Sequence, residues 1–295
     1  MIGNMGVLKP PEADGVYTAG CVTPERWRKG VPADIHLMIF GDSTAAGLGC
    51  TTPEGVPGVR IARGLAEETG KRIRLSTKAI SGASSKGLRS QVDAMFVTGP
   101  APDAAVILVG ANDVIKQHSP RSSAQRLGET VARLRAAGAV VVVGTCPDFG
   151  VITAIPQPLR TYMRGYGLRI ARAQAVATRA AGGHAVSLAD LLAPEFLASP
   201  DQMFSADRFH PSAAGYELAA RQILPMLADA LGEWVGGPIP DQPVVSEAAE
   251  RRRLVALATD ALNRFLRKHD QEAAVSRVLE AADSGEQRSA MARAN

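Results

Sequence analysis

Apolar runs alternate with amphipathic stretches along most of the chain. Residues 36–40 form an apolar run that ends at Gly41, and residues 104–109 and 139–143 are apolar without interruption. Continuous apolar runs of this length between turn residues are typical of strands buried on both faces of a parallel sheet. Two further strands are predicted by the alternating segment at 73–79 and the short segment at 185–188.

The segments between these strands carry apolar residues at helical spacing. Gly70, which follows the first of these segments, is expected to end its helix as a C-cap. Regular alternation of strands and helices predicts a parallel sheet with helices on both faces. Residues 190–211 are predicted to be mostly loop. The helices are expected at 57–69, 86–96, 122–137, 160–181 and 213–231.

Breaker residues divide the chain into four parts. The first is a Pro- and Gly-rich arm with one short helix expected near residues 24–29, and the third is a Gly/Pro linker. The fourth part is charged and carries apolar residues at helical spacing in two narrow stripes. We expect it to dock on its own domain or on a second subunit as a homo-oligomer, with residues 284–295 disordered. The expected bounds are 1–34, 35–235, 236–245 and 246–295.

Composition and charge argue against some classes of partner. The chain is 46% apolar, and its net charge of +4 over 295 residues is too small and too evenly spread to predict a nucleic-acid partner. The first twelve residues lack the pattern of a signal peptide, and no apolar run is long enough for an integral membrane segment. Three cysteines without a CxxC pair predict free thiols. These features together predict a cytoplasmic protein.

Four short elements carry groups suited to acyl chemistry. Ser43 follows the first main strand, Gly82 lies in a loop after the second, and Asn112 follows the third. Because the carboxyl ends of parallel strands meet at one edge of a sheet, these three residues are expected to converge. Asp207 and His210 lie in a fourth element before the last helix, which can reach the same edge.

The residue types complement one another. A serine hydroxyl is a poor nucleophile without a base, and a histidine can take its proton at neutral pH. The three-residue spacing of Asp207 and His210 allows the carboxylate to hold the second ring N–H. The Ser43 N–H, the Gly82 N–H and the Asn112 side chain are candidate donors to an oxyanion. The alternatives are that Ser43 and Asn112 belong to ordinary turns and that Gly82 only relieves a tight one.

Ser43, Gly82, Asn112 and His210, in this order, match the four blocks of the SGNH hydrolases, also called GDSL esterases/lipases. The chain resembles this family over roughly residues 35–232, and the segments 11–15 and 156–160 resemble actinobacterial members. The resemblance implies a flavodoxin-like three-layer α/β/α fold with about five parallel strands, plus a C-terminal helical extension. It also implies ester or thioester hydrolysis by a Ser43–His210–Asp207 triad, with an oxyanion hole formed by Ser43, Gly82 and Asn112.

The expected reaction is hydrolysis of short-chain, acetyl-like esters, so the expected partner is a small acyl ester. An acyltransferase with the same triad is an alternative, because the pocket selects the acceptor. A catalytically silent flavodoxin-like binding module is a third. No cofactor and no metal are expected, because no metal-ligand spacing occurs. Asp42 and Cys50 are expected to be structural. Four histidines have no hydroxyl or acidic partner in a matching motif and are expected to be incidental to the chemistry: His36, His118, His184 and His269.

Overall fold

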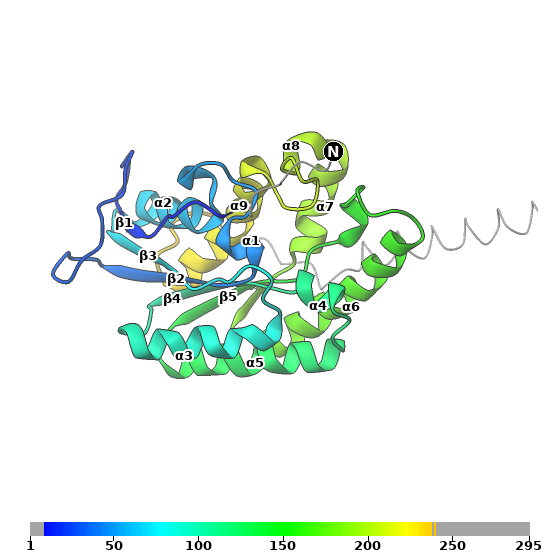
Figure 1. Ribbon diagram of the computed structural model, residues 1–295. Helices are drawn as coiled ribbons and strands as arrows, with labels where there is room; N and C mark the ends of the chain where they lie inside the picture. Colours follow the sequence, from blue (N-terminus) through cyan, green and yellow to red (C-terminus); the bar gives the residue numbers. More distant parts are fainter. Residues whose placement is uncertain (1–8, 238, 240–295) are drawn as a thin grey trace, which may run out of the picture. The chain divides into compact units, whose positions relative to one another are not determined.

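The computed structural model describes residues 9–237 and 239, which fold around a six-stranded sheet (Figure 1). Five strands run parallel, and β1 joins the edge of the sheet antiparallel to β3. The spatial order is β1-β3-β2-β4-β5-β6, so the predicted parallel α/β fold is confirmed. The strands are β1 Gly15–Tyr17, β2 Ile35–Gly41, β3 Ile73–Thr77, β4 Ala104–Leu108, β5 Val140–Gly144 and β6 His184–Val186.

Helices cover both faces of the sheet (Figure 1). α2 and α9 lie over one face, and α3, α5 and α6 lie over the other. The α-helices are α1 Ser43–Ala46, α2 Pro57–Thr69, α3 Leu88–Thr98, α4 Ala111–Ile115, α5 Pro120–Ala136, α6 Leu159–Ala180, α7 Leu188–Ala198, α8 Pro200–Met203 and α9 Ala213–Ala230. Short 3₁₀ turns are η1 Pro53–Gly55, η2 Ser85–Gly87 and η3 Phe149–Val151.

The apolar run of β2 is explained by burial on both faces. Leu37 and Ile39 belong to the core that also contains the buried sides of α2 and α9. Met38 and Phe40 point to the opposite side and pack in the core with α3 and α5. Because successive side chains of a strand alternate between faces, a strand between two helical layers has no solvent-exposed position along its length.

Helix α2 has the predicted bounds and the predicted C-cap. Pro57 stands at its first turn, where a missing N–H costs nothing. Gly70 ends it in the left-handed conformation with φ of 67°, and its N–H donates to the Ala66 carbonyl. This end is readable from the sequence because a glycine tolerates positive φ without a steric penalty.

Two sequence predictions for this part of the chain are wrong. The arm before residue 35 contributes strand β1, and Glu25 pairs with Val16 where a helix was expected. Residues 190–211 were predicted to be mostly loop, but α7 and α8 occupy much of this range. Leu188, Leu192 and Phe196 recur every four residues and form the buried stripe of α7, although Pro194 interrupts the pattern. The predicted helical tail and most of the linker lie outside the described residues.

Candidate active site

Ser43 is the first residue of α1, directly after the central strand β2. Gly41 makes the sharp turn between them: its φ is 135°, and a Cβ atom there would lie 1.8 Å from the Leu108 carbonyl oxygen. Asp42 then caps α1 by accepting a hydrogen bond of 2.9 Å from the Thr44 N–H. This turn places Ser43 at the carboxyl edge of the sheet, beside the point where the strand order reverses between β2 and β4.

His210 reaches Ser43 from a loop between α8 and α9. Its Nε2 lies 3.0 Å from the Ser43 Oγ, although the two residues are 167 positions apart. The loop is closed like a small hairpin, because the Ser205 N–H donates to the His210 carbonyl and Phe204 pairs with Pro211. The histidine is therefore held by backbone contacts as well as by its own side chain.

Asp207 holds the other side of the His210 ring. Its Oδ2 lies 2.6 Å from Nδ1, and its Oδ1 accepts the backbone N–H groups of Phe209 and His210 and the Ser205 hydroxyl, each at 2.8 Å. Burial opposes ionisation of this carboxyl, but the hydrogen bond from His210 and the three others lower the pKa of Asp207 to about 2. The structure thus brings Ser43, His210 and Asp207 into one continuous series of hydrogen bonds.

Gly82 and Asn112 lie on opposite sides of Ser43 at the same edge. The chain continues alongside β2 beyond the end of β3 as far as Ile80, whose N–H donates to the Gly41 carbonyl at 3.1 Å, and Gly82 follows two residues later. Asn112 lies in the first turn of α4, the helix that follows β4. The expected convergence of loops after parallel strands therefore accounts for both positions.

Asp42 is a buried carboxyl beneath this site, only 1% exposed. Burial raises its pKa to about 6, and the nearby Asp113 charge adds to the rise, whereas the Thr44 N–H and His210 lower it. Its hydrogen bond to the Thr44 N–H agrees with the structural role expected for it.

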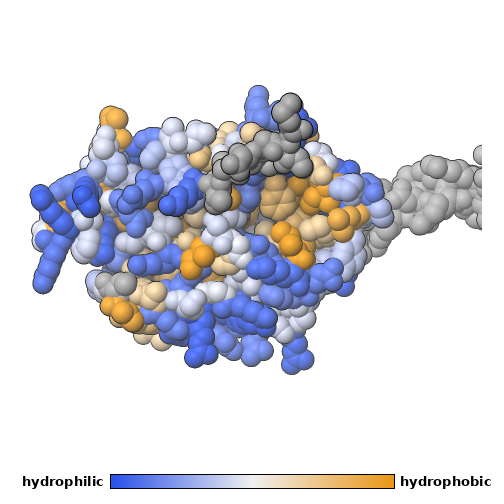
Figure 2. Space-filling view, in the orientation of Figure 1, coloured by the Kyte–Doolittle hydropathy of each residue, from blue (hydrophilic) through white to orange (hydrophobic). Residues whose placement is uncertain are grey.

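An apolar cavity opens beside His210. It offers ≈ 80 Å³ to the centre of a water-sized sphere, and four of the chain's seven phenylalanines line it. Figure 2 shows apolar side chains gathered around a hollow in the part of the view where Figure 1 places α1, α4 and α7. The Phe209 ring lies 5.1 Å from the His210 ring, edge to face, so the aromatic lining reaches the polar site. The four aromatic residues are Phe149, Phe196, Phe204 and Phe209.

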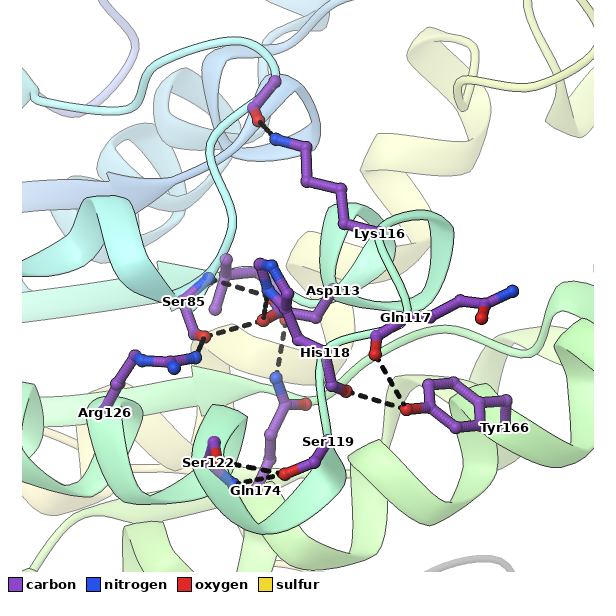
Figure 3. A network of polar contacts seen from close by, with 12 residues as sticks. Ser85, Asp113, Lys116, Gln117, His118, Ser119, Ser122, Arg126, Tyr166 and Gln174 are labelled. Carbon is purple, nitrogen blue, oxygen red and sulfur yellow. Dashed lines mark hydrogen bonds and ion pairs between the residues drawn. The ribbon is translucent and has the colours of Figure 1, made fainter.

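Asp113, next to Asn112, is the centre of a polar network (Figure 3). It is fully buried; its Oδ2 accepts the Ser85 N–H at 2.8 Å, and its Oδ1 accepts the Ser85 hydroxyl at 2.6 Å. The same Oδ1 lies 3.1 Å from Nδ1 of His118. His118, which was expected to be incidental to the chemistry, joins this network, and its partner Asp113 precedes it by five residues across the end of α4.

Two buried glutamines near the strand ends were not predicted to have a role. Gln91 of α3 hydrogen-bonds Gly41, and Gln174 of α6 joins the ends of two strands. The Gln174 side chain accepts the Cys146 N–H at 2.8 Å and donates to the Val109 carbonyl at 2.9 Å. Both glutamines satisfy backbone groups where the strands diverge toward the site.

The remaining candidates are structural. Cys50 lies in the core, where burial raises the pKa of its thiol to about 11, and the three cysteines are unpaired as predicted. His36, which was expected to be incidental to the chemistry, contacts the Ser76 hydroxyl at 3.0 Å. Burial and the Arg74 charge lower its pKa to about 4, which keeps it neutral.

In the described part of the chain, no three His, Cys, Asp or Glu residues form a group suited to a metal ion. No helix within residues 9–237 combines the length and apolar composition that crossing a lipid bilayer requires.

Comparison with known sequences shows which family this chain resembles. Residues 39–218 match the GDSL-like Lipase/Acylhydrolase family. The chain is 64% identical over 234 residues to the GDSL-like esterase Rv1075c of Mycobacterium tuberculosis, an alignment that covers 79% of this chain and 74% of that protein. It is 27% identical over 197 residues to the esterase TesA of Pseudomonas aeruginosa, which covers 65% of this chain and 87% of TesA.

Solved structures agree on the fold. The crystal structure of the lipase/acylhydrolase from Enterococcus faecalis matches with a TM-score of 0.51 at 18% identity, over 70% of this chain and 100% of that one. At this level of identity the match concerns the arrangement of strands and helices.

Proposed function

This chain belongs to the GDSL-like lipase/acylhydrolase family and is a carboxylic ester hydrolase, and on that premise we propose that it cleaves short-chain acyl esters through an acyl-enzyme on Ser43. One observation carries the proposal. The Ser43 hydroxyl, the His210 ring and the Asp207 carboxylate form one series of contacts of 3.0 and 2.6 Å. This is the arrangement of nucleophile, base and orienting acid that acyl transfer requires.

Acylation begins when the Ser43 oxygen attacks the ester carbonyl carbon while His210 Nε2 takes the hydroxyl proton. The carbonyl oxygen becomes an oxyanion in the tetrahedral intermediate. As the intermediate collapses, the bond to the leaving alcohol breaks, and the imidazolium returns its proton to the departing oxygen. The products are a free alcohol and an acyl-Ser43 ester.

Deacylation repeats these steps with water. His210 takes a proton from the water as its oxygen attacks the acyl carbon, and the proton then returns to the Ser43 oxygen. The carboxylic acid leaves, and the enzyme is restored. Asp207 stays ionised throughout, because the hydrogen bonds it accepts lower its pKa to about 2. It therefore stabilises the imidazolium and orients the ring without becoming protonated itself.

Three donors are proposed to stabilise the oxyanion. The Ser43 N–H lies in the first turn of α1, where helical N–H groups have no intrahelical partner. The Gly82 N–H comes from the loop on one side of Ser43, and the Asn112 side chain comes from the first turn of α4 on the other. Donors fixed in advance at the position of the developing charge are worth far more than donors in water, because they need no reorganisation.

The cavity beside His210 is proposed to take the acyl chain. Its apolar lining suits a hydrocarbon, and its ≈ 80 Å³ corresponds to roughly five to eight water-sized positions at about 10–15 Å³ each. A methylene group needs about the space of one water molecule. We therefore propose substrates with acyl chains of roughly five to eight carbons, somewhat longer than the acetyl group that the sequence suggested.

The test uses the full chain with a series of p-nitrophenyl esters and a fluorophosphonate probe. Ser43→Ala should lower kcat by at least a thousandfold and abolish labelling, with an unchanged circular-dichroism spectrum. Ser90→Ala is the matched control, since Ser90 is exposed and bonds only the Gly87 carbonyl among the contacts described. Activity of Ser43→Ala within tenfold of the parent, or labelling at another serine, refutes the proposal.

A further inference from the structure

Lys116 links the loop that carries Gly82 to the helix α4, which carries Asn112. Its backbone N–H donates to the Asn112 carbonyl at 3.0 Å at the end of α4, and its Nζ donates to the Gly82 carbonyl at 2.8 Å (Figure 3). We propose that Lys116 is a positioning residue for ester hydrolysis, which holds the Gly82 N–H at the oxyanion site defined by Asn112 and Ser43. This inference rests on the proposed role of these donors and adds a residue that no family block contains.

The direction of the Gly82 N–H depends on the type of turn that carries it. The Ala83 N–H donates to the Ile80 carbonyl at 3.0 Å, which closes a four-residue turn with Ser81 and Gly82 at its centre. Gly82 has φ of 78°, and Ser81 is not among the residues with positive φ, so the turn is type II. Types I and II differ by a flip of the peptide unit between the central residues, and this unit contains the Gly82 N–H.

Packing does not hold this peptide unit. Gly82 is exposed, and no atom lies within 4 Å of the point where its Cβ would be. Polar contacts hold it instead, because the following peptide unit is bonded at both ends. Its N–H, from Ala83, donates to Ile80, and its carbonyl, from Gly82, accepts from Lys116. Without the Lys116 ammonium, the turn keeps only one of these two contacts.

The backbone around Lys116 is held in place on both sides. The Lys116 side chain can therefore hold the Gly82 carbonyl at a fixed position. On one side, Asp113 accepts two hydrogen bonds from Ser85, which ties α4 to the loop after Gly82. On the other, the Tyr166 hydroxyl bonds the carbonyls of Gln117 and His118 at 3.3 and 3.0 Å (Figure 3). Lys116 therefore bridges a fixed helix end and an exposed turn that otherwise has few restraints.

The experiment compares Lys116→Met, Lys116→Arg and Lys86→Met in the full chain with a p-nitrophenyl butyrate assay. Lys116→Met keeps the apolar stem but removes the donor, and we expect kcat to fall about tenfold with KM within twofold. Loss of a whole oxyanion donor lowers kcat about 100–1,000-fold, so loosening one donor should lower kcat by less than this. Lys116→Arg should recover at least a third of the parent kcat. Lys86→Met removes an exposed charge nearby and should leave kcat unchanged.

A second readout separates positioning from a general structural effect. An alkyl boronic acid that forms a tetrahedral adduct with Ser43 should bind Lys116→Met more weakly by the same factor as the loss of kcat/KM. The melting temperature should stay within about 1 °C, because the contact is exposed. An unchanged kcat in Lys116→Met, an equal loss in Lys86→Met, or a defect that disappears in about 1 M salt overturns the inference. Salt at that concentration screens exposed charges beyond about 3 Å, so the last outcome identifies a long-range charge effect.

Asn112→Ala distinguishes this inference from the proposed function. If Asn112→Ala lowers kcat about 100-fold while Lys116→Met does not change it, the oxyanion assignment stands and the role of Lys116 is refuted. If Asn112→Ala retains full activity, the oxyanion assignment is wrong, and the Lys116 inference is refuted with it.

Discussion

The side-chain amide of Gln91 hydrogen-bonds both polar backbone groups of Gly41. Its Oε1 accepts the Gly41 N–H at 2.8 Å, and its Nε2 donates to the Gly41 carbonyl at 2.7 Å. Gln91 lies on α3 and is 2% exposed, so these bonds are made away from water. They supply hydrogen-bond partners to the last residue of β2, where the chain leaves the sheet and turns toward Ser43, two residues later.

We predict that Gln91→Leu lowers the free energy of unfolding by about 2–3 kcal/mol, because it leaves the buried Gly41 N–H without an acceptor. Urea denaturation followed by fluorescence measures the change. Gln125→Leu is the matched control: Gln125 is exposed and bonds only Glu129 in the described contacts, so its replacement should cost less than about 0.5 kcal/mol. Equal stability of the two variants contradicts the role given to Gln91.

The proposed triad predicts that replacing His210 and replacing Asp207 lower the catalytic rate by different factors. His210→Ala should be as damaging as Ser43→Ala, because His210 is the base that contacts the hydroxyl among the described residues. Asp207→Ala should cost less, about 100-fold, since the loop that holds His210 is also closed by the Ser205 and Phe204 backbone contacts. Steady-state kinetics on one ester gives both ratios. A smaller loss in His210→Ala than in Asp207→Ala rules out this division of roles.

The pH profile provides an independent check on the base. A histidine accepts a proton only when neutral, so kcat/KM should rise between about pH 5 and 8, where histidines titrate. Asp207 has a pKa of about 2 and stays ionised over this whole range, so it adds no second step. A flat profile from pH 5 to 9, with chemistry as the slow step, is incompatible with a histidine base.

Asp42→Asn should stabilise the protein at neutral pH. The folded state raises the pKa of Asp42 to about 6, from 3.8, so the folded protein binds the proton more tightly than the unfolded chain. Stability from this group therefore falls as the pH rises from about 4 to 6, and the penalty persists above 6. Asparagine keeps the acceptor for the Thr44 N–H without the charge. One pKa unit corresponds to about 1.4 kcal/mol, so we expect a gain of about 1–3 kcal/mol at pH 7.5.

Thermal melts of Asp42→Asn and the parent at pH 4 and pH 7.5 measure this gain. It should nearly vanish at pH 4, where Asp42 is mostly protonated in the folded state. A stabilisation that is the same at both pH values, or a loss at pH 7.5, shows that burial does not oppose ionisation of Asp42.

The parts of the site that the sequence predicted are those set by local pattern or by topology. Asp207 and His210 are three residues apart in one turn, and Ser43, Gly82 and Asn112 follow parallel strands that end at one edge. The unpredicted parts are single contacts between distant positions. Lys116 and its Gly82 partner are 34 residues apart, and Gln91 and Gly41 are 50 apart.

Such contacts leave no periodic signal. A lysine after a short helix or a glutamine within an amphipathic one normally has no partner that the sequence indicates, and only the folded chain shows which backbone group each side chain contacts. The aromatic cavity was hidden in the same way. One of its four phenylalanines comes from η3, and the other three come from residues 190–211, which were predicted to be mostly loop. Four of the seven phenylalanines therefore meet at one place that no pattern in the sequence indicated.

The cavity leads to the last prediction, which concerns acyl length. Ala193 lines the cavity from α7, and Ala193→Leu adds three carbons to its wall. Each buried methylene of a substrate contributes about 0.8 kcal/mol, or roughly fourfold in kcat/KM. The variant should therefore lower the ratio of kcat/KM for hexanoyl over acetyl esters by about 10–50-fold, with acetyl hydrolysis nearly unchanged.

Ala198→Leu is the matched control, because Ala198 lies on the same helix but is exposed and outside the cavity lining. It should leave the hexanoyl-to-acetyl ratio as in the parent. Phe149→Ala removes another part of the cavity wall and should extend the accepted chain beyond about eight carbons. An unchanged ratio in folded Ala193→Leu shows that the acyl chain binds elsewhere, and that the aromatic cavity has a different role from the one proposed here.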